Sequence, residues 1–436
     1  MKETLRNSIL MPYLAWCARL IVAKNKPLVI GITGSVGKSS TKEAIYCVLK
    51  NRFRVRKSQG NLNNEIGLPL AVIGEQDPRG NWLEWVGILV KGFFLCWKRV
   101  RSYPKILILE MAVDRPGDMR YLVSLAPPKI GVITDIGVTN WEFFSDARKI
   151  LQEKSILIKN LPADGLAVLN HDNAQLRSFA KTFTRPVLTY GFRAGADILA
   201  SDLKIGYAPD LGEGVNLAKG VGFRVSYKTI FLPFELPNII SKAQAFSVLA
   251  ATAVATHLGM NLVEIANNLK NYQPLPGRMR LLRGKRGNLI IDDTYNAAPN
   301  SVKSALEVLA LVKSKKKTVI LGDMLELGAL EEKSHRELAK IIYPVANKII
   351  LVGKRTAATN KELRKLGYQD KIYHFHLVTN LVPKLPSLVG KGEVVLVKGS
   401  QGLRMEKVVE ALVIKKELDK LTRQDKYWRR KGVKEV

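Results

Sequence analysis

The chain has 436 residues, with 69 Lys and Arg against 38 Asp and Glu and a formal net charge of +31. At about 100–200 residues per domain this length predicts two or three domains. A content of 47% apolar and 25% charged residues excludes a disordered chain. The three cysteines form no CxxC pair, which excludes a disulfide scaffold and a zinc ribbon and suits a reducing cytosol. We therefore expect a globular cytoplasmic protein.

The excess of positive charge predicts attraction to polyanions, namely nucleic acids, anionic lipids or phosphorylated substrates. The basic residues are spread along the whole chain, and no RRM, KH or zinc-finger signature accompanies them. We expect no specific nucleic-acid partner.

Two apolar segments raise the question of membrane contact. They cover residues 7–23 and 85–97, and each carries or adjoins Lys and Arg residues. Both fall short of the ~20 apolar residues that a membrane-spanning helix needs, and the first lacks the cleavage pattern of a signal peptide. One interpretation is two amphipathic helices packed on the protein. The other is peripheral docking on the inner face of the plasma membrane, with aromatic residues among the headgroups and basic residues on anionic lipid.

Short β-branched runs alternate with helix-like segments, which is typical of parallel sheets covered by helices. The expected strands are 27–33, 105–110, 129–134 and 166–170, followed by a second set at 287–292, 317–322, 348–353 and 393–398. Residues 200–237 predict a small β-rich excursion, and 243–259 predict a buried helix. Several strands end in a polar residue or a glycine, where α/β sheets bind their ligands.

The two sets of strands predict two α/β domains. We place a short amphipathic basic segment at 1–27, a central domain at 28–275 and a C-terminal domain at 276–414. A linker rich in Pro, Gly and Arg covers about 273–287, and a basic tail at 415–436 is expected to form a fraying helix.

The strongest chemical motif is the run from Gly31 to Ser40, GITGSVGKSS, between a strand and a helix that we expect over 41–49. Glycines let the backbone wrap a phosphate, and the amides of the helix start supply donors. Lys38 would reach the β- and γ-phosphates, and the Ser39 hydroxyl would bind Mg²⁺. The general pattern has glycine where this chain has Ile32. The expected ATP-binding residues are Thr33, Gly34, Ser35, Val36, Gly37, Lys38, Ser39 and Ser40.

This TGSxGK[ST][ST] loop resembles that of the Mur ligases, the ATP-dependent amide-forming enzymes of peptidoglycan synthesis. The D-D-x-Y-N-A-x-P and G-D-M-L-E-L-G blocks make the chain most similar to the members that add D-alanyl-D-alanine. The matching blocks are 60–70, Glu110, 134–137, 142–144, Lys154, 169–172, 276–279, 292–299, 322–328 and 397–406.

The resemblance implies a central P-loop domain with a mainly parallel sheet plus a C-terminal Rossmann-like α/β domain. It implies that ATP phosphorylates a carboxylate and that an amine attacks the acyl phosphate. The favoured substrates are a UDP-N-acetylmuramoyl tripeptide and D-alanyl-D-alanine, with Mg²⁺ as cofactor and a monomeric enzyme. Charge develops on the transferred phosphoryl group, so such a site needs cations and fixed donors.

The resemblance also implies roles for single residues of the central domain. Glu110 would bind Mg²⁺ together with Ser39, and Lys154 would be the lysine that CO₂ carbamylates into an anionic metal ligand. Asn140 stands where the family usually has a metal-site histidine. Asn63 and Asn64 belong to a block that we assign to substrate binding.

In the C-terminal domain, the resemblance assigns Arg278 to the phosphates. Asp293, Tyr295 and Asn296 match the segment on the ribose and adenine side of ATP, while a core aromatic residue is the alternative for Tyr295. Lys398 and Ser400 match the block that faces the incoming amine.

The front of the chain departs from the family pattern. Only about 27 residues precede the first expected strand, where the D-alanyl-D-alanine-adding members carry a domain for the UDP-sugar. One alternative is therefore a Mur-like ligase acting on a different carboxylate, such as a lipid-linked one. Because of Asn140, a nucleotide-binding protein that has lost catalysis is another.

Overall fold

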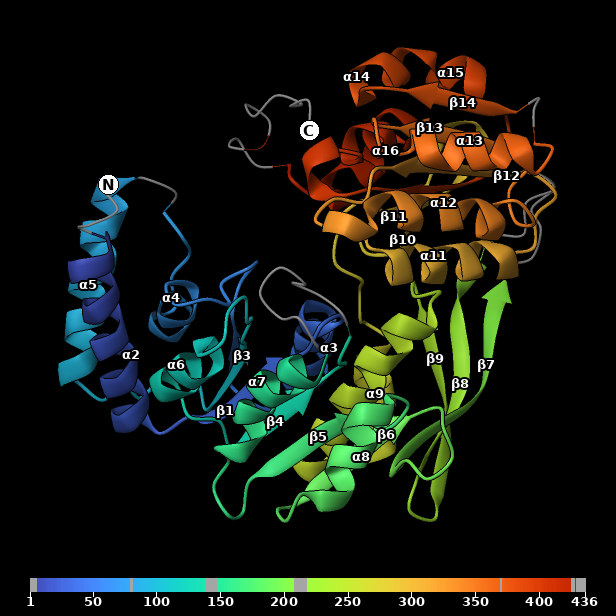
Figure 1. Cartoon of the computed structure of the whole chain (residues 1–436). Helices are drawn as coiled ribbons and strands as arrows, with labels where there is room; N and C mark the ends of the chain where they lie inside the picture. Colours follow the sequence, from blue (N-terminus) through green and yellow to red (C-terminus); the bar gives the residue numbers. More distant parts are fainter. Residues whose placement is uncertain are drawn as a thin grey trace. The chain divides into compact units, whose positions relative to one another are not determined.

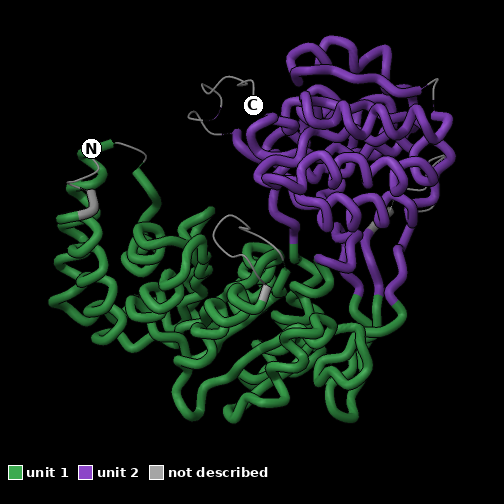
Figure 2. The backbone as a smooth tube through the Cα atoms, viewed as in Figure 1, with its two compact units in different colours: residues 1–202, 223–234, 244–272 green, residues 203–222, 235–243, 273–436 purple. Residues whose placement is uncertain are grey.

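Two sheets organise the chain, and each lies mostly within one of two compact units (Figures 1 and 2). The computed structural model describes residues 6–78, 81–137, 147–207, 218–368, 371–424 and 428. Unit 1 comprises Met1–Asp202, Phe223–Phe234 and Gln244–Tyr272, and unit 2 comprises Leu203–Gly222, Glu235–Ala243 and Gln273–Val436. The α/β class expected from the sequence is confirmed.

The first sheet has the strand order β2-β3-β1-β4-β5-β6-β7-β8-β9. Neighbouring strands from β2 to β7 run parallel. Because the chain goes from β1 to one side for β3 and to the other for β4, the loop after β1 lies at a topological switch point. The strands are β1 (Leu28–Thr33), β2 (Val55–Lys57), β3 (Ile106–Glu110), β4 (Ile130–Ile133), β5 (Leu166–Asn170), β6 (Val187–Gly191), β7 (Ile198–Tyr207), β8 (Ala218–Tyr227) and β9 (Ile230–Pro237).

The helices up to residue 272 begin with a π-helical turn that leads into α2. α2 buries Leu14 and Ile21 in one core with residues of α4 and α6, such as Leu68 and Leu122. The segments are η1 (Arg6–Leu10), α2 (Met11–Asn25), α3 (Lys38–Leu49), α4 (Gly67–Ile73), α5 (Trp82–Trp97), α6 (Asp118–Leu125), α7 (Ala147–Lys159), α8 (Ala174–Thr182), α9 (Lys242–His257) and α10 (Leu262–Leu269). Among the described residues, no helix has both the length and the apolar character needed to cross a membrane.

The second sheet has the order β10-β11-β15-β12-β13-β14, and only β10 pairs in antiparallel fashion. Successive strand residues alternate between two cores: Ile291 and Leu321 pack with α11 and α12, while Ile290 and Ile320 pack with α14 and α16. Both faces are thus covered, as a parallel sheet requires. The strands are β10 (Arg280–Arg283), β11 (Leu289–Asp293), β12 (Lys317–Gly322), β13 (Lys348–Val352), β14 (Ile372–Phe375) and β15 (Val394–Lys398).

The remaining helical segments follow β10 in the chain. They are η2 (Lys285–Gly287), α11 (Pro299–Leu311), η3 (Gly328–Leu330), α12 (Glu331–Ile342), α13 (Ala357–Lys365), α14 (Val378–Leu381), η4 (Val382–Lys384), α15 (Leu385–Leu388), η5 (Gln401–Leu403), α16 (Glu406–Leu412) and η6 (Lys415–Lys420).

All eight expected strands are present, as are the β-rich excursion (β7 to β9) and the buried helix (α9). One interpretation needs correction. The segment interpreted as a linker contains strand β10, because pairing with β11 stabilises it at the edge of the sheet. In the tail, where a fraying helix is expected, Lys415–Lys420 form the 3₁₀ segment η6, Leu421 is extended and buried, and Trp428 is helical. The remaining tail residues after Gln424 lie outside the described part of the chain.

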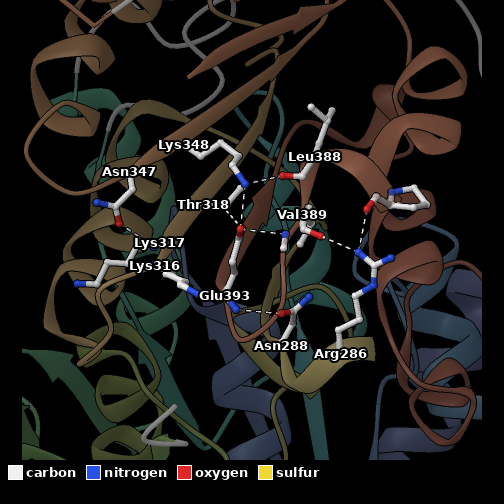
Figure 3. A network of polar contacts seen from close by, with 12 residues as sticks. Arg286, Asn288, Lys316, Lys317, Thr318, Asn347, Lys348, Leu388, Val389 and Glu393 are labelled. Atoms are coloured by element: carbon white, nitrogen blue, oxygen red, sulfur yellow. Dashed lines mark hydrogen bonds and ion pairs between the residues drawn. The ribbon is translucent and has the colours of Figure 1, made fainter. Parts of the chain in front are cut away.

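A polar network ties together the amino ends of the strands in unit 2 (Figure 3). The buried Glu393 carboxylate accepts hydrogen bonds from Thr318 Oγ1 (2.6 Å), Lys348 Nζ (2.9 Å) and the Gly390 amide (2.9 Å). Asn288 Oδ1 accepts from the Glu393 amide at 2.9 Å. Burial opposes ionisation, but the hydrogen bonds from Thr318 and Lys348 outweigh it and lower the pKa of Glu393. This network lies at the edge opposite to the carboxyl ends and so has a structural role.

Candidate active site

The loop between β1 and α3 has the backbone that phosphate binding needs. Gly34 has a φ of +146°, and a Cβ there would lie 2.1 Å from Thr134 Oγ1. Gly37 has a φ of +84° and immediately precedes α3. Ile32, which replaces the glycine of the general pattern, is a buried residue of β1 and pairs in register with Glu110. The strand therefore continues through this position, and the positive φ angles that favour glycine occur at Gly34 and Gly37.

Residues that follow β4 hold this loop in place. The Ser35 amide donates to the Asp135 carbonyl at 2.9 Å. The Ser35 hydroxyl donates to the Gly137 carbonyl at 2.9 Å and lies 3.0 Å from the Gly137 amide. Lys38 Nζ, from the first turn of α3, donates to the Gly34 carbonyl at 2.8 Å. The loop is thus preorganised, with its lysine folded over it.

Glu110 ends β3, next to β1, and is 2% exposed. Its Oε1 accepts hydrogen bonds from Ser39 Oγ (3.2 Å) and Asn63 Nδ2 (3.1 Å). Lys42 Nζ forms an ion pair with Oε2 at 3.1 Å. Burial opposes ionisation of this carboxyl, but Lys42 and Lys38 outweigh that effect and keep its pKa below the ordinary value. Glu110 is therefore a carboxylate at neutral pH.

Two buried oxygens beside the loop lack hydrogen-bond partners. They are Thr33 Oγ1 and Glu110 Oε2, and the second has only the ion pair with Lys42. Buried polar atoms without partners are rare and indicate a missing ligand, ion or water. No group of three or more His, Cys, Asp or Glu side chains that could enclose a metal occurs in the described ranges. The Ser39 hydroxyl and the Glu110 carboxylate are oxygen groups of the kind that Mg²⁺ prefers as ligands, so these two residues fit a magnesium ion.

Lys154, on α7, reaches the same loop. It is buried, and its Nζ donates to the Gly34 carbonyl at 3.4 Å. Burial and, second, the positive charge of Lys38 lower the pKa of Lys154 to about 7, although Asp114 and Glu153 oppose this. A substantial fraction of this amine is thus neutral near pH 7. Lys154 is therefore a buried residue beside the loop and not a surface lysine.

Further predicted residues lie around this centre or outside the described part of the chain. Asn64 Oδ1 accepts from the Gly67 amide at 2.9 Å and so caps a turn. Val36 is exposed, and Ser40 is half-buried in the first turn of α3. Asn140 lies outside the described residues, as does the 142–144 block.

In unit 2, the carboxyl ends of β11 and β15 bring Asp293 and Lys398 together. Lys398 is 1% exposed, and its Nζ donates to Asp293 Oδ2 (2.6 Å) and to the Asn296 carbonyl (2.8 Å). Ser400 Oγ donates to the Ala297 carbonyl at 3.3 Å and accepts from the Leu325 amide at 2.9 Å. Both predicted substrate-binding side chains thus hold the 293–297 segment in place.

The same segment presents Tyr295 and Asn296. The Arg278 guanidinium lies 4.0 Å from the centre of the Tyr295 ring, a cation–π contact. Tyr295 is half-buried and Asn296 is exposed. The core-aromatic alternative for Tyr295 is wrong, because its ring stacks with arginine at the edge of the sheet. Neighbouring Asp292 is fully buried, which raises its pKa to about 6 despite hydrogen bonds from Thr294.

Sequence reasoning missed two buried cations that position these groups. Lys42 pairs with Glu110 and donates to the Gly60 carbonyl at 2.9 Å. The sequence feature that could have identified Lys42 is its position one helical turn after Lys38, on the same face of α3. Arg423 donates to the Tyr295 carbonyl at 2.7 Å and to Glu406 Oε2 at 2.9 Å. Nothing in its basic, charged surroundings distinguishes Arg423 in the sequence.

Comparison with known proteins gives the same result for both units. The family model of the Mur ligase middle domain matches residues 32–78 and 94–255, and that of the Mur ligase glutamate ligase domain matches 277–401. The UDP-N-acetylmuramoyl-tripeptide–D-alanyl-D-alanine ligase of Bacillus subtilis is 30% identical over 388 residues, which cover 88% of this chain and 76% of that protein. The Escherichia coli ligase of the same name is 26% identical over 403 residues, covering 91% and 78%.

A solved structure agrees with these matches. The MurF ligase of Thermotoga maritima, crystallised in complex with ADP, is 28% identical, with a TM-score of 0.75 over 94% of this chain and 84% of that one. The resemblance inferred from the motifs is thereby confirmed. The chain has a phosphate loop at the switch point of one sheet and a buried carboxylate beside that loop, and the family models match both units. It therefore belongs to the Mur ligase family, among its D-alanyl-D-alanine-adding members.

Proposed function

We propose that this protein joins D-alanyl-D-alanine to a UDP-N-acetylmuramoyl tripeptide in an ATP-dependent reaction of peptidoglycan synthesis. The carboxylate of the tripeptide attacks the γ-phosphorus of ATP and releases ADP. The amine of the dipeptide then attacks the acyl phosphate, forms the amide and releases phosphate. The relatives' names supply the substrates, and the Glu110 cluster beside the phosphate loop is the observation that supports the chemistry.

The residues of unit 1 supply charge stabilisation and positioning. The loop amides and Lys38 bind the phosphates and stabilise the charge that develops during transfer. Ser39 and Glu110 would hold Mg²⁺, which would neutralise phosphate charge. Asn63 and Lys42 keep the Glu110 carboxylate oriented and ionised, since both contact it directly.

We assign Lys154 to carbamylation. Its neutral amine would form an N–C bond to CO₂ and release one proton, leaving an anionic carbamate as a further oxygen ligand. The burial that lowers the pKa to about 7 favours this reaction, because only the unprotonated amine is a nucleophile.

In unit 2, we assign Arg278 to phosphate binding and Asp293, Tyr295 and Asn296 to the nucleoside end of ATP. The contacts of Lys398 and Ser400 support a positioning role toward this segment rather than direct substrate binding.

ADP release by the purified full chain tests this function. The assay contains Mg-ATP, the UDP-muramoyl tripeptide and D-alanyl-D-alanine in bicarbonate buffer, omits each in turn, and identifies the amide by mass spectrometry. We expect turnover only with all three. Lys38→Ala should lower kcat by about 100-fold or more. Lys50→Ala, at an exposed lysine just after α3, is the matched control and should retain full activity.

Two outcomes would contradict the proposal. Intact ATP binding without turnover on this substrate set would favour a different carboxylate substrate, such as a lipid-linked one. ATP binding without turnover on any muramoyl peptide would favour a nucleotide-binding protein that has lost catalysis.

A further inference from the structure

Helix α5 exposes an unusually apolar surface in unit 1. Seven side chains, from 45% to 69% exposed, form what we call the α5 face: Trp82, Leu83, Val86, Val90, Phe93, Phe94 and Trp97. At about 100° per residue these positions fall within one continuous arc of roughly 120°. Contiguous exposed apolar surfaces of this kind mark interaction sites.

The opposite side of α5 fixes its orientation. Its buried residues Ile88, Gly92 and Cys96 are spaced by four and face α2, which lies beside α5 (Figure 1). A Cβ on Gly92 would lie 3.4 Å from Cys17 Sγ, so the two helices approach closely there. Lys24 of α2 donates to the Cys96 carbonyl at 3.2 Å. The α5 face is therefore held outward by a packed interface.

An apolar pocket continues the α5 face toward the start of α2. It has a volume of about 640 Å³ and is lined by Ile9, Leu10, Tyr13, Leu89, Val90, Phe93 and Phe94. The Tyr13 hydroxyl donates to the Leu89 carbonyl at 2.8 Å, which leaves the pocket lining almost wholly hydrocarbon. Such a pocket favours a hydrocarbon chain over a polar ligand.

Positive charge lies directly beyond the α5 face. Lys98, Arg99 and Arg101 follow the helix and are all exposed. The only charged residues within α5 are Glu84 and Lys91, both outside the apolar arc. A second copy of this chain would bring the same basic residues near each other, whereas anionic headgroups would neutralise them.

We propose that the α5 face docks unit 1 on the surface of an anionic lipid bilayer. The 16 residues of α5 extend over about 24 Å, less than the ~30 Å of a hydrocarbon core. The helix therefore lies in the interface with its tryptophans and phenylalanines among the headgroups and upper acyl chains. Lys98, Arg99 and Arg101 contact lipid phosphates.

Sedimentation of the full chain with vesicles tests this docking, independently of ligase activity. One set of vesicles contains phosphatidylcholine alone, and the other contains phosphatidylglycerol as well. We expect binding to the anionic vesicles that weakens as salt increases. Phe94→Ser with Trp97→Ser should reduce the bound fraction by about tenfold or more. Lys98→Glu with Arg99→Glu should do the same on anionic vesicles.

Matched variants control for general effects. Ile230→Ser with Phe231→Ser removes two equally exposed apolar side chains from another part of unit 1, and Lys315→Glu with Lys316→Glu reverses two exposed consecutive cations. Both should bind like the parent chain, and all variants should keep its melting temperature because the sites are exposed. Equal binding by the α5 variants and the controls would overturn the proposal. So would a concentration-dependent dimer that Phe94→Ser with Trp97→Ser dissociates.

Discussion

The Lys154 Nζ lies 3.4 Å from the Gly34 carbonyl oxygen, so a lysine of α7 with a lowered pKa contacts the phosphate loop. Burial and the charge of Lys38 both disfavour its protonated form. The folded state therefore binds fewer protons than the unfolded chain between about pH 7 and the ordinary lysine pKa of about 10.4. The buried charge lowers the free energy of unfolding by its full amount below about pH 7, and this effect disappears as the pH rises toward about 10.4.

Lys154→Met should consequently raise stability while it abolishes ligase activity. In CO₂-free buffer without nucleotide we expect a gain in the free energy of unfolding of about 2–4 kcal/mol at pH 7. The gain should shrink toward pH 9.5, as measured by urea unfolding at several pH values. Lys159→Met, at an exposed lysine on the same helix, is the control. A gain that does not change with pH would contradict this account.

Glu110→Gln should separate folding from metal-dependent catalysis. The amide keeps the shape of the carboxylate but removes the charge that pairs with buried Lys42. We expect a loss of kcat of about 100-fold or more and a higher Mg²⁺ concentration for half-maximal activity. Asn63→Asp, which places a second carboxyl beside Glu110, should raise the pKa of the pair and shift the acid limb of the pH profile upward. Normal Mg²⁺ dependence in Glu110→Gln would remove this residue from the metal site.

The sequence was sufficient for the parts of the site that depend on local pattern. β-branched runs predicted the strands, and the glycine-rich run after the first strand predicted a loop that contains Gly34 and Lys38. The role of Glu110 came from the family resemblance. Residues whose role depends on long-range packing were not predictable. Lys42 acquires its role only because β3 pairs beside β1, which places Glu110 opposite α3.

The same limit explains why strand β10 and the role of Arg423 were not predicted. Strand β10 lies in a stretch rich in Pro, Gly and Arg and owes its conformation to pairing with β11. Arg423 looks like any residue of a charged tail, yet it is buried against Glu406. Amino-acid composition indicates the conformation and exposure of a segment taken by itself. Pairing with a strand or burial against a residue elsewhere in the fold can change both.

Arg423→Gln should therefore affect both stability and nucleotide affinity. Its guanidinium donates to the Thr294 and Tyr295 carbonyls, so its loss frees the segment that carries Asn296. Glu406 keeps Arg404 as a partner, which limits the destabilisation to about 2–3 kcal/mol. We expect a higher KM for ATP with little change in kcat, measured by steady-state ADP release. Lys416→Gln, at an exposed position of the same segment, should change neither. A loss confined to kcat would contradict this positioning role.

Glu393→Gln should make the stability of unit 2 less dependent on pH in the acid range. The lowered pKa of Glu393 means that its carboxylate stabilises the folded state above the unfolded pKa of about 4.3, and that this contribution is lost as the pH falls through the folded value. At pH 7 the variant leaves the Lys348 ammonium without its carboxylate and should lose about 2–3 kcal/mol.

The difference between Glu393→Gln and the parent chain should therefore be largest from pH 6 to 8 and should disappear as the pH falls through the lowered pKa of the folded state. Chemical unfolding at pH 7 and melting curves down to pH 3 measure it. Glu337→Gln, at an exposed acid on α12, is the control and should lose less than about 0.5 kcal/mol at any pH. A protonated carboxyl and an amide have nearly the same shape, so the difference should depend on the charge of Glu393. A difference that persisted unchanged in acid would therefore contradict this account.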